Sequence, residues 1–270
     1  MSRSGNEIDA QASGPPVFKR ILCGVDGTEA SLVAVRQAQR LQDESGSVLL
    51  SAVANLAQAA QAGTAAPHAA ELLQHEAEAA LAEAQAIAPS ASSKLVNGSP
   101  VAVLLKQAED EGATLICIGS HGHRRAAGLL LGSVAARILR DATCSVLVAR
   151  AARNAETWPQ TVVVGVDGSV ESSAAFAVAQ SVADRFGGSV HAVASTKDQH
   201  DREATQAVAP EVEEHDASAV NVLVEASESA DLVVVGSRGL HGLKAIGSVS
   251  ERVAHQAHSS VLVVRTGQPV

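Results

Sequence analysis

A glycine-rich segment is the first candidate for chemistry. It runs from Gly119 through Gly122 to Gly132 and ends at Ser133, directly before the helical pattern VAARILRDA. Glycine permits positive φ angles and lets a backbone approach a ligand closely. Ser133 stands where a helix N-cap is expected, and a helix N-terminus offers free N–H groups and a positive dipole end to an anion. The segment therefore predicts a phosphate-binding loop.

Asp26 is a second candidate, and its side chain is negatively charged. It follows the short apolar run ILCGV at residues 21–25. A carboxylate repels phosphate, but it accepts hydrogen bonds from hydroxyl groups such as those of a ribose, or from an adenine amine. Together, Asp26 and the loop describe a nucleotide whose sugar lies near Asp26 and whose phosphates lie on the loop.

Each of these features also has an ordinary structural explanation. Glycines at strand ends, Asp-Gly turns and Gly-Ser before a helix are common turn and cap chemistry. Arg124 and Arg125 could clamp phosphates or could be solvated loop charges. The pairs His121/His123 and His255/His258 have the spacing of metal ligands, but no cysteine or carboxylate frames them. We therefore predict no metal site and no catalytic residue.

Apolar runs alternate with helical patterns, which predicts βαβ units and a parallel sheet. In the first half we expect strands at 21–25, 48–54, 94–98, 114–119 and 144–150, and helices at 29–44, 68–88, 101–112 and 133–142. Five strands and four crossover helices form a doubly wound sheet of order 3-2-1-4-5. Asp26 and Gly119 then follow neighbouring strands where the strand order reverses, which is where such sheets bind ligands.

The chain carries this pattern twice, which fixes a two-domain α/β architecture. Asp26 aligns with Asp167 at a distance of 141 positions, Gly119 with Gly236 at 117, and Gly132 with Gly247 at 115. The second copy is therefore shorter by 24 residues in its middle (141 − 117) and by 2 in its glycine loop (117 − 115). We expect its strands at 162–166, 189–194, 207–213, 231–236 and 260–265, and its helices at 171–186, 217–228 and 248–257, with two or three helical turns within 196–206. Pro210 weakens the strand at 207–213.

Composition narrows the class of protein. A length of 270 residues suggests two domains, and 46% hydrophobic residues suffice for buried cores. A net charge of −9, with three Phe, one Trp and no Tyr, argues against a nucleic-acid binder. The three cysteines, Cys23, Cys117 and Cys144, lie in or beside apolar runs and are expected to be buried thiols. Without a signal-peptide pattern or a long apolar run, we expect a cytoplasmic protein with no membrane partner.

The glycine pattern resembles that of the universal stress protein family. Nucleotide-binding members carry Gly-x-x-Gly, nine residues, and then Gly-Ser/Thr, and the first copy reproduces this spacing, with residues 123–131 between the two glycine pairs. In the first copy the resemblance implies an ATP site, with or without Mg²⁺, lined by Asp26, the backbone near Val53, Gly119, Gly122, Gly132, Ser133 and Val134. In the second copy the matching residues are Asp167, Gly236, Gly239, Gly247, Ser248 and Val249. Residues 240–246 leave only seven positions in that loop, so we expect the nucleotide mainly in the first copy.

The resemblance covers about residues 18–150 and 161–266. It implies one domain at 18–150 and a second domain at 161–266. Residues 1–17 are polar and contain Gly and Pro, so we expect a disordered tail there, and we expect a linker at 151–160, where Pro159 lies near the end. The closing strands at 144–150 and 260–265 are apolar edge candidates, which folded proteins rarely leave exposed. Because the last strands of this family pair across a two-fold interface, we expect an intramolecular pseudo-dimer. Whether two whole chains also form a homodimer is left open by the sequence.

Three functions follow from the sequence. The first is a nucleotide-binding regulator of the stress response, with slow or absent turnover, because the chain has no Walker Gly-Lys-Ser/Thr motif and no obvious metal pair of the kinase type. The second is an ATP-independent dimerising interaction protein. The third is a slow ATPase or autophosphorylating protein, with Ser120 or Ser133 as acceptor. We favour the first.

Overall fold

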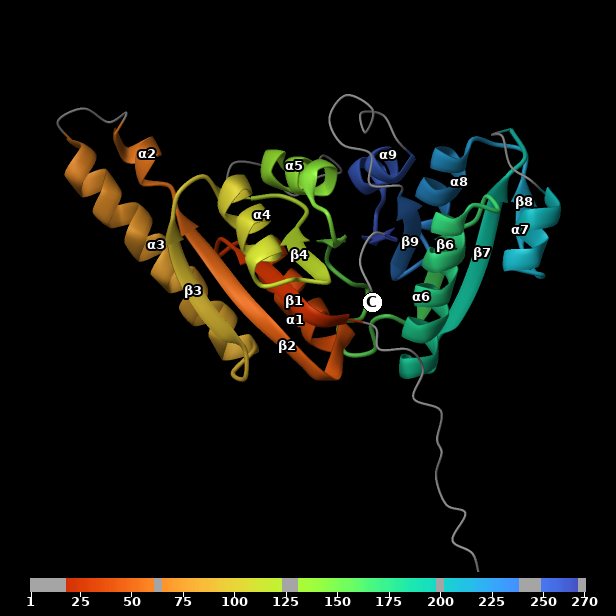
Figure 1. Ribbon diagram of the computed structural model, residues 1–270, viewed down its shortest axis with the longest axis horizontal. Helices are drawn as coiled ribbons and strands as arrows, with labels where there is room; N and C mark the ends of the chain where they lie inside the picture. The colour runs from red at the N-terminus through yellow and green to blue at the C-terminus, as the bar shows by residue number, and fades with distance from the viewer. Residues whose placement is uncertain (1–17, 61–64, 123–130, 198–201, 238–248, 267–270) are drawn as a thin grey trace, which may run out of the picture.

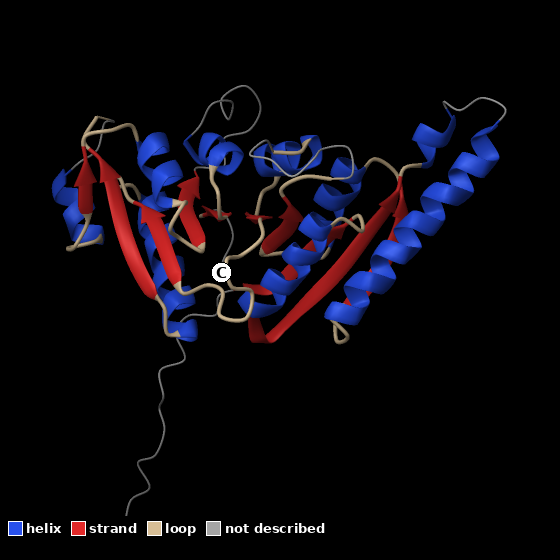
Figure 2. Ribbon diagram, turned by 180° about the vertical axis from the view of Figure 1, so that it is seen from behind, coloured by secondary structure: helices blue, strands red, loops and turns tan. Residues whose placement is uncertain are grey.

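The computed structural model describes residues 18–60, 65–122, 131–197, 202–237 and 249–266. These residues form a ten-stranded sheet with helices on both faces (Figure 1, Figure 2). The order of the strands is β3-β2-β1-β4-β5-β10-β9-β6-β7-β8. The first half of the chain supplies one side of the sheet and the second half the other.

The first half contains five strands and five helices within the described residues. The strands are β1 (Phe18–Val25), β2 (Gln42–Ala54), β3 (Ser92–Asn97), β4 (Leu115–Gly119) and β5 (Ser145–Ala149). The helices are α1 (Glu29–Leu41), α2 (Leu56–Ala59), α3 (Ala66–Ile87), α4 (Pro100–Asp110) and α5 (Ser133–Asp141).

The second half repeats this plan with shorter elements. Its strands are β6 (Thr161–Gly165), β7 (Ser189–Ser195), β8 (Glu213–His215), β9 (Leu232–Ser237) and β10 (Ser260–Arg265). Its helices are α6 (Val170–Phe186), α7 (Arg202–Val208), α8 (Ala219–Ala226) and α9 (Val249–Gln256).

Each half is a parallel sheet with its own strands in the order 3-2-1-4-5, so the predicted doubly wound fold is confirmed. The halves meet where β5 pairs with β10 in the antiparallel direction. Val146, Leu147 and Val148 lie opposite Val263, Leu262 and Val261, respectively. We call this β5–β10 junction the seam. This pairing covers the apolar edges of both β5 and β10.

Alternating strand residues divide the core into two layers. Ile21 and Cys23 of β1 point into the layer formed with α1, α3 and α6, whereas Leu22 points into the layer formed with α4, α5, α8 and α9. Each layer runs through both halves of the molecule. The strands are therefore covered on both faces, which explains their continuous apolar runs.

Several predicted boundaries differ from the structure. The strand predicted at 207–213 is wrong, because α7 ends at Val208 and β8 begins only at Glu213. Pro210 separates the two elements, as expected of a residue that cannot donate to a ladder. In the first half, α1 ends at Leu41 and β2 begins at Gln42, six positions before the predicted strand, with an irregular register between Phe18 and Arg20.

Trp158, within the predicted linker, is packed rather than free. It is 1% exposed, and its Nε1 atom donates a 3.0 Å hydrogen bond to the carbonyl oxygen of Asp231. The connection between the halves is therefore fixed to the start of β9. Among the described residues, the structure contains no helix long and apolar enough to cross a membrane.

Candidate nucleotide site

Asp26 is held in a tight turn between β1 and α1. Its Oδ1 atom accepts hydrogen bonds from the backbone N–H of Thr28 at 3.1 Å and from the Thr28 hydroxyl at 2.6 Å. Thr28 is also the N-cap of α1, because its hydroxyl accepts from the N–H of Ser31. Gly27 has a φ of 76°, which favours glycine at this position. The turn therefore fixes an exposed carboxylate at the end of β1.

Gly119 ends β4 directly against the first turn of α1. A Cβ atom at Gly119 would lie 2.7 Å from the carbonyl carbon of Ala30 and 2.8 Å from the backbone nitrogen of Ser31. Only glycine allows this approach, so its first role is packing. The close contact also brings the end of β4 next to the Asp26 turn.

The glycine-rich loop is closed at its base by a backbone hydrogen bond. The N–H of Gly132 donates to the carbonyl oxygen of Ser120 at 2.7 Å, and the N–H of Ser120 donates to Ala149 at 3.0 Å. Gly122 lies over the Asp26 turn, since a Cβ atom on it would stand 3.0 Å from Oδ2 of Asp26. Arg124, Arg125 and His123 lie outside the described residues.

Helix α5 begins at this closure, and its start corrects one prediction. Gly132 is the N-cap, with extended backbone angles (φ −67°, ψ 154°), and Ser133 is the first helical residue rather than the cap. Gly132 has no side chain that could accept from the first turn. The leading N–H groups of a helix have no partner within it, so they can serve an anion.

These segments enclose a pocket of about 260 Å³ at the carboxyl ends of β1, β2 and β4. All seven residues predicted for the first copy line it: Asp26, Val53, Gly119, Gly122, Gly132, Ser133 and Val134. The sequence reasoning missed other wall residues, among them Ser31, Ser51, Pro100, Leu104, Ile118, His121 and Ala135. The lining thus combines a polar, glycine-rich wall with a largely apolar wall that includes Val53, Leu104 and Ile118.

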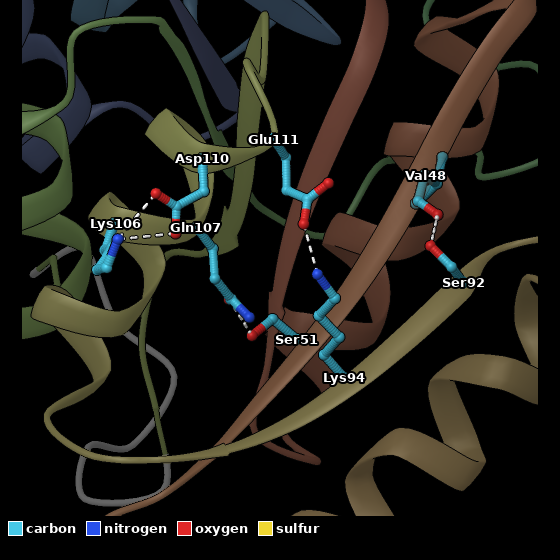
Figure 3. A network of polar contacts seen from close by, with 8 residues as sticks. All are labelled: Val48, Ser51, Ser92, Lys94, Lys106, Gln107, Asp110 and Glu111. Carbon is cyan, nitrogen blue, oxygen red and sulfur yellow. Dashed lines mark hydrogen bonds and ion pairs between the residues drawn. The ribbon is translucent and has the colours of Figure 1, made fainter.

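The apolar wall is positioned by contacts between β2 and α4. The Ser51 hydroxyl donates to Oε1 of Gln107 at 2.6 Å (Figure 3). Figure 3 also shows the ion pair between Lys94 of β3 and Glu111 at the end of α4. A Cβ atom on Gly24 would lie 2.9 Å from Cδ1 of Leu104, so glycine at 24 lets α4 pack closely on β1.

The comparisons with known proteins agree with this architecture. The sequence model of the universal stress protein family matches residues 18–150 and 192–265. The chain belongs to the universal stress protein family. The second match begins within β7, yet β6 and α6 in the second half have the same arrangement as β1 and α1 in the first.

Individual universal stress proteins resemble most of the chain. Universal stress protein Rv2623 of Mycobacterium tuberculosis is 33% identical over 207 residues, covering 66% of this chain and 69% of the relative. Universal stress protein Mb2028c of Mycobacterium bovis is 35% identical over 206 residues, covering 65% and 69%. The crystal structure of a universal stress protein from Archaeoglobus fulgidus covers 95% of this chain and 99% of its own, with a TM-score of 0.74 at 22% identity, and supports the fold alone.

The second universal stress protein repeat forms a corresponding pocket of about 310 Å³. Asp167 sits in the same turn as Asp26, because its Oδ1 accepts from the N–H of Ser169 at 3.0 Å and from the Ser169 hydroxyl at 2.5 Å. Asp167, Gly236 and Val249 line the pocket. The predicted Gly239, Gly247 and Ser248 lie outside the described residues. Gly236 repeats the packing role of Gly119, since a Cβ atom there would lie 2.4 Å from the Glu171 carbonyl oxygen.

The remaining candidate side chains are placed elsewhere. Ser120 is 4% exposed, and its hydroxyl lies 3.0 Å from Nδ1 of His121. Nε2 of His258 lies 3.8 Å from Oε1 of Glu228, and both side chains are exposed at the surface. In the described part of the chain, no group of three or more His, Cys, Asp or Glu side chains could hold a metal ion.

Proposed function

We propose that this universal stress protein is a nucleotide-binding regulator of the stress response that binds ATP in the pocket of its first half. The observation that carries the proposal is that one pocket is lined both by the Asp26 carboxylate and by the closed glycine loop with the α5 N-terminus. A nucleotide matches both, because its ribose hydroxyls can donate to a carboxylate and its phosphates can accept from N–H groups.

The proposed pose follows from the pocket walls. The ribose hydroxyls donate to Asp26, and the phosphates lie on the loop and the first turn of α5. The adenine lies along the apolar wall near Val53 and Leu104. Magnesium enters with the ATP, because Mg²⁺ is commonly held by substrate phosphates and waters.

We further propose binding with slow or absent turnover. Phosphoryl transfer requires a positioned acceptor or water together with metal ligands. Of the two serines considered as acceptors, Ser120 is buried against His121, whereas Ser133 is exposed at the start of α5. If phosphate is transferred to the protein, we therefore expect Ser133 to be the acceptor. Nucleotide occupancy, rather than its consumption, would be the signal.

The second half has a different proposed role. We propose that residues 161–266 form a domain that pairs with the domain at 18–150 and binds nucleotide weakly, with 151–160 connecting them. The support is its glycine loop, which is two residues shorter than the first, as the alignment offsets of 117 and 115 require.

The test combines retained ligand and direct binding. Mass spectrometry of freshly purified, denatured protein should detect an adenine nucleotide. Titration with labelled ATP should show a loss of affinity of about 10- to 100-fold in Asp26→Ala, as expected when hydrogen bonds to a charged group are lost. The matched variant is Asp167→Ala, which removes the same turn carboxylate from the second half. Equal ATP binding by wild type and Asp26→Ala would reject the site, and absence of binding by both would favour the ATP-independent interaction protein.

A further inference from the structure

Helix α5 connects the pocket to the seam between the two halves. Its first residues, Ser133 to Ala135, line the pocket, and at its other end the carbonyl oxygen of Leu139 accepts a hydrogen bond from Nη2 of Arg265. Arg265 is the last residue of β10 and therefore comes from the second half. A helix of nine residues spans about 13 Å. One short rigid element thus contacts both the pocket and the neighbouring domain.

The Arg265 contact is buried, and a backbone hydrogen bond fixes the residue at the end of β10. The residue is 7% exposed, and its backbone N–H donates to the Ser145 hydroxyl at 3.2 Å. Burial lowers the pKa of its guanidinium, while the nearby Asp141 carboxylate acts in the opposite direction. A cation at the C-terminus of a helix also interacts favourably with the helix dipole. The guanidinium is therefore a specific anchor for α5 rather than a surface charge.

The first turn of α5 depends on such an anchor. Its N-cap, Gly132, has no side chain to hold the turn, and a helix of this length is marginal without tertiary contacts. Its buried face is small, consisting of Ala135, Ile138 and Leu139. Because a helix moves as a rigid unit, displacing its C-terminus would displace the N–H groups at the pocket.

We propose that Arg265 is a positioning residue for the phosphate end of the first-half pocket. By holding the Leu139 carbonyl, the second half sets where the α5 N-terminus presents its N–H groups. The proposal rests on the proposed ATP site, and it makes that site dependent on the neighbouring domain. It concerns the phosphates and not the nucleoside, since the Arg265 hydrogen bonds described above go to Ser145 and Leu139, whereas Asp26 and Val53 lie on other elements.

The chain itself offers a matched control. Arg150 follows β5, is 9% exposed, and donates from Nη2 to the carbonyl oxygen of Ala254 in α9 at 2.6 Å. Its backbone N–H donates to the Ser260 hydroxyl at 3.0 Å, just as that of Arg265 donates to Ser145. Arg150 therefore makes the reciprocal contact across the same seam but anchors the helix of the second half.

The experiment measures dissociation constants of ATP and adenosine for the full chain and its variants by calorimetry. Arg265→Met should weaken ATP about tenfold and adenosine less than about twofold, whereas Arg150→Met should leave both within about twofold. Arg265→Lys, which keeps the charge and can still donate to the Leu139 carbonyl oxygen, should keep ATP affinity to within about threefold of wild type. Hydrogen exchange without nucleotide should be faster, in Arg265→Met only, at the amide of Ala136, which donates to the Gly132 carbonyl oxygen in the first turn of α5.

The outcomes separate the two proposals. If wild type binds neither ligand, the proposed function fails and the positioning role falls with it. If wild type binds ATP but Arg265→Met weakens ATP and adenosine alike, or Arg150→Met has the same effect on ATP, the positioning role alone is overturned. If Arg265→Met does not fold, Arg265→Gln, which keeps a donor without the charge, should still weaken ATP about threefold, and an unchanged ATP affinity there would overturn the role.

Discussion

Gly122 and Asp26 face each other so closely that a Cβ atom on residue 122 would lie 3.0 Å from Oδ2 of the aspartate. Gly122 follows β4 and Asp26 follows β1, and the two strands are paired neighbours in the sheet. This contact explains physically why residue 122 is a glycine, independently of its place in a motif. A larger side chain must displace either the carboxylate or the loop.

Gly122→Val should therefore impair binding without unfolding the protein. We expect ATP affinity to fall at least about tenfold, while the free energy of unfolding changes by less than about 1 kcal/mol, because Gly122 lies in a partly exposed loop. Calorimetry and urea denaturation measure the two quantities. Gly122→Ala, with one added carbon, should show a smaller loss. Wild-type affinity in Gly122→Val would contradict the placement of the loop over Asp26.

Gly119→Ala should instead destabilise the fold. The added Cβ would stand 2.7 Å from the Ala30 carbonyl carbon in α1, and overpacking of this kind costs about 1–3 kcal/mol. Gly236→Ala should have a similar effect in the second half, where the clash is with Glu171. Urea denaturation of the two variants tests this. Unchanged midpoints would show that α1 and α6 are less tightly packed than the structure indicates.

The seam should contribute strongly to stability. Leu262 of β10 is fully buried opposite Leu147 of β5, so Leu262→Ala should lower the free energy of unfolding by about 2–5 kcal/mol. Leu72→Ala on α3 is the control, because this side chain is 52% exposed and its loss should cost less than about 1 kcal/mol. Similar costs for the two variants in a denaturant titration would argue against a packed seam.

Alkaline pH should destabilise the protein in part through Cys144. Burial raises the pKa of this thiol from 9.0 to about 11. A raised pKa in the folded state means that the stabilisation is complete below pH 9 and is lost as pH rises toward the folded value. Wild type should therefore lose up to about 2–3 kcal/mol more than Cys144→Ala between pH 8.5 and 11. Parallel stability curves for the two proteins would exclude this contribution.

The sequence could predict the sheet order and which residues meet at its carboxyl edge. Asp26 and Gly119 were expected to be neighbours because crossover connections in parallel sheets follow restrictive rules, and both line one pocket. The wall formed by Ser51 and Leu104 was missed. It depends on register, with Gly24 opposite Ser51, and on the packing of α4 over Gly24. An apolar run in the sequence specifies neither the register of its strand nor the packing of a helix over it.

Local competition explains the remaining errors. Ser133 is a good N-cap by type, but Gly132 takes that position because its N–H closes the loop on Ser120. The segment 207–213 has strand-like apolar residues, yet the chain there is divided between α7 and β8. The Arg265 contact with Leu139 could not be foreseen, since it exists only after the two halves pair antiparallel at the seam.

Calorimetric titration of the intact chain with ATP tests the central claim most directly, because it gives the number of sites as well as their affinity. We predict about one tight site per chain, abolished or weakened about 10- to 100-fold by Asp26→Ala and retained in Asp167→Ala. Two equal sites, or a site that is lost in Asp167→Ala and kept in Asp26→Ala, would contradict the assignment of the nucleotide to the first half.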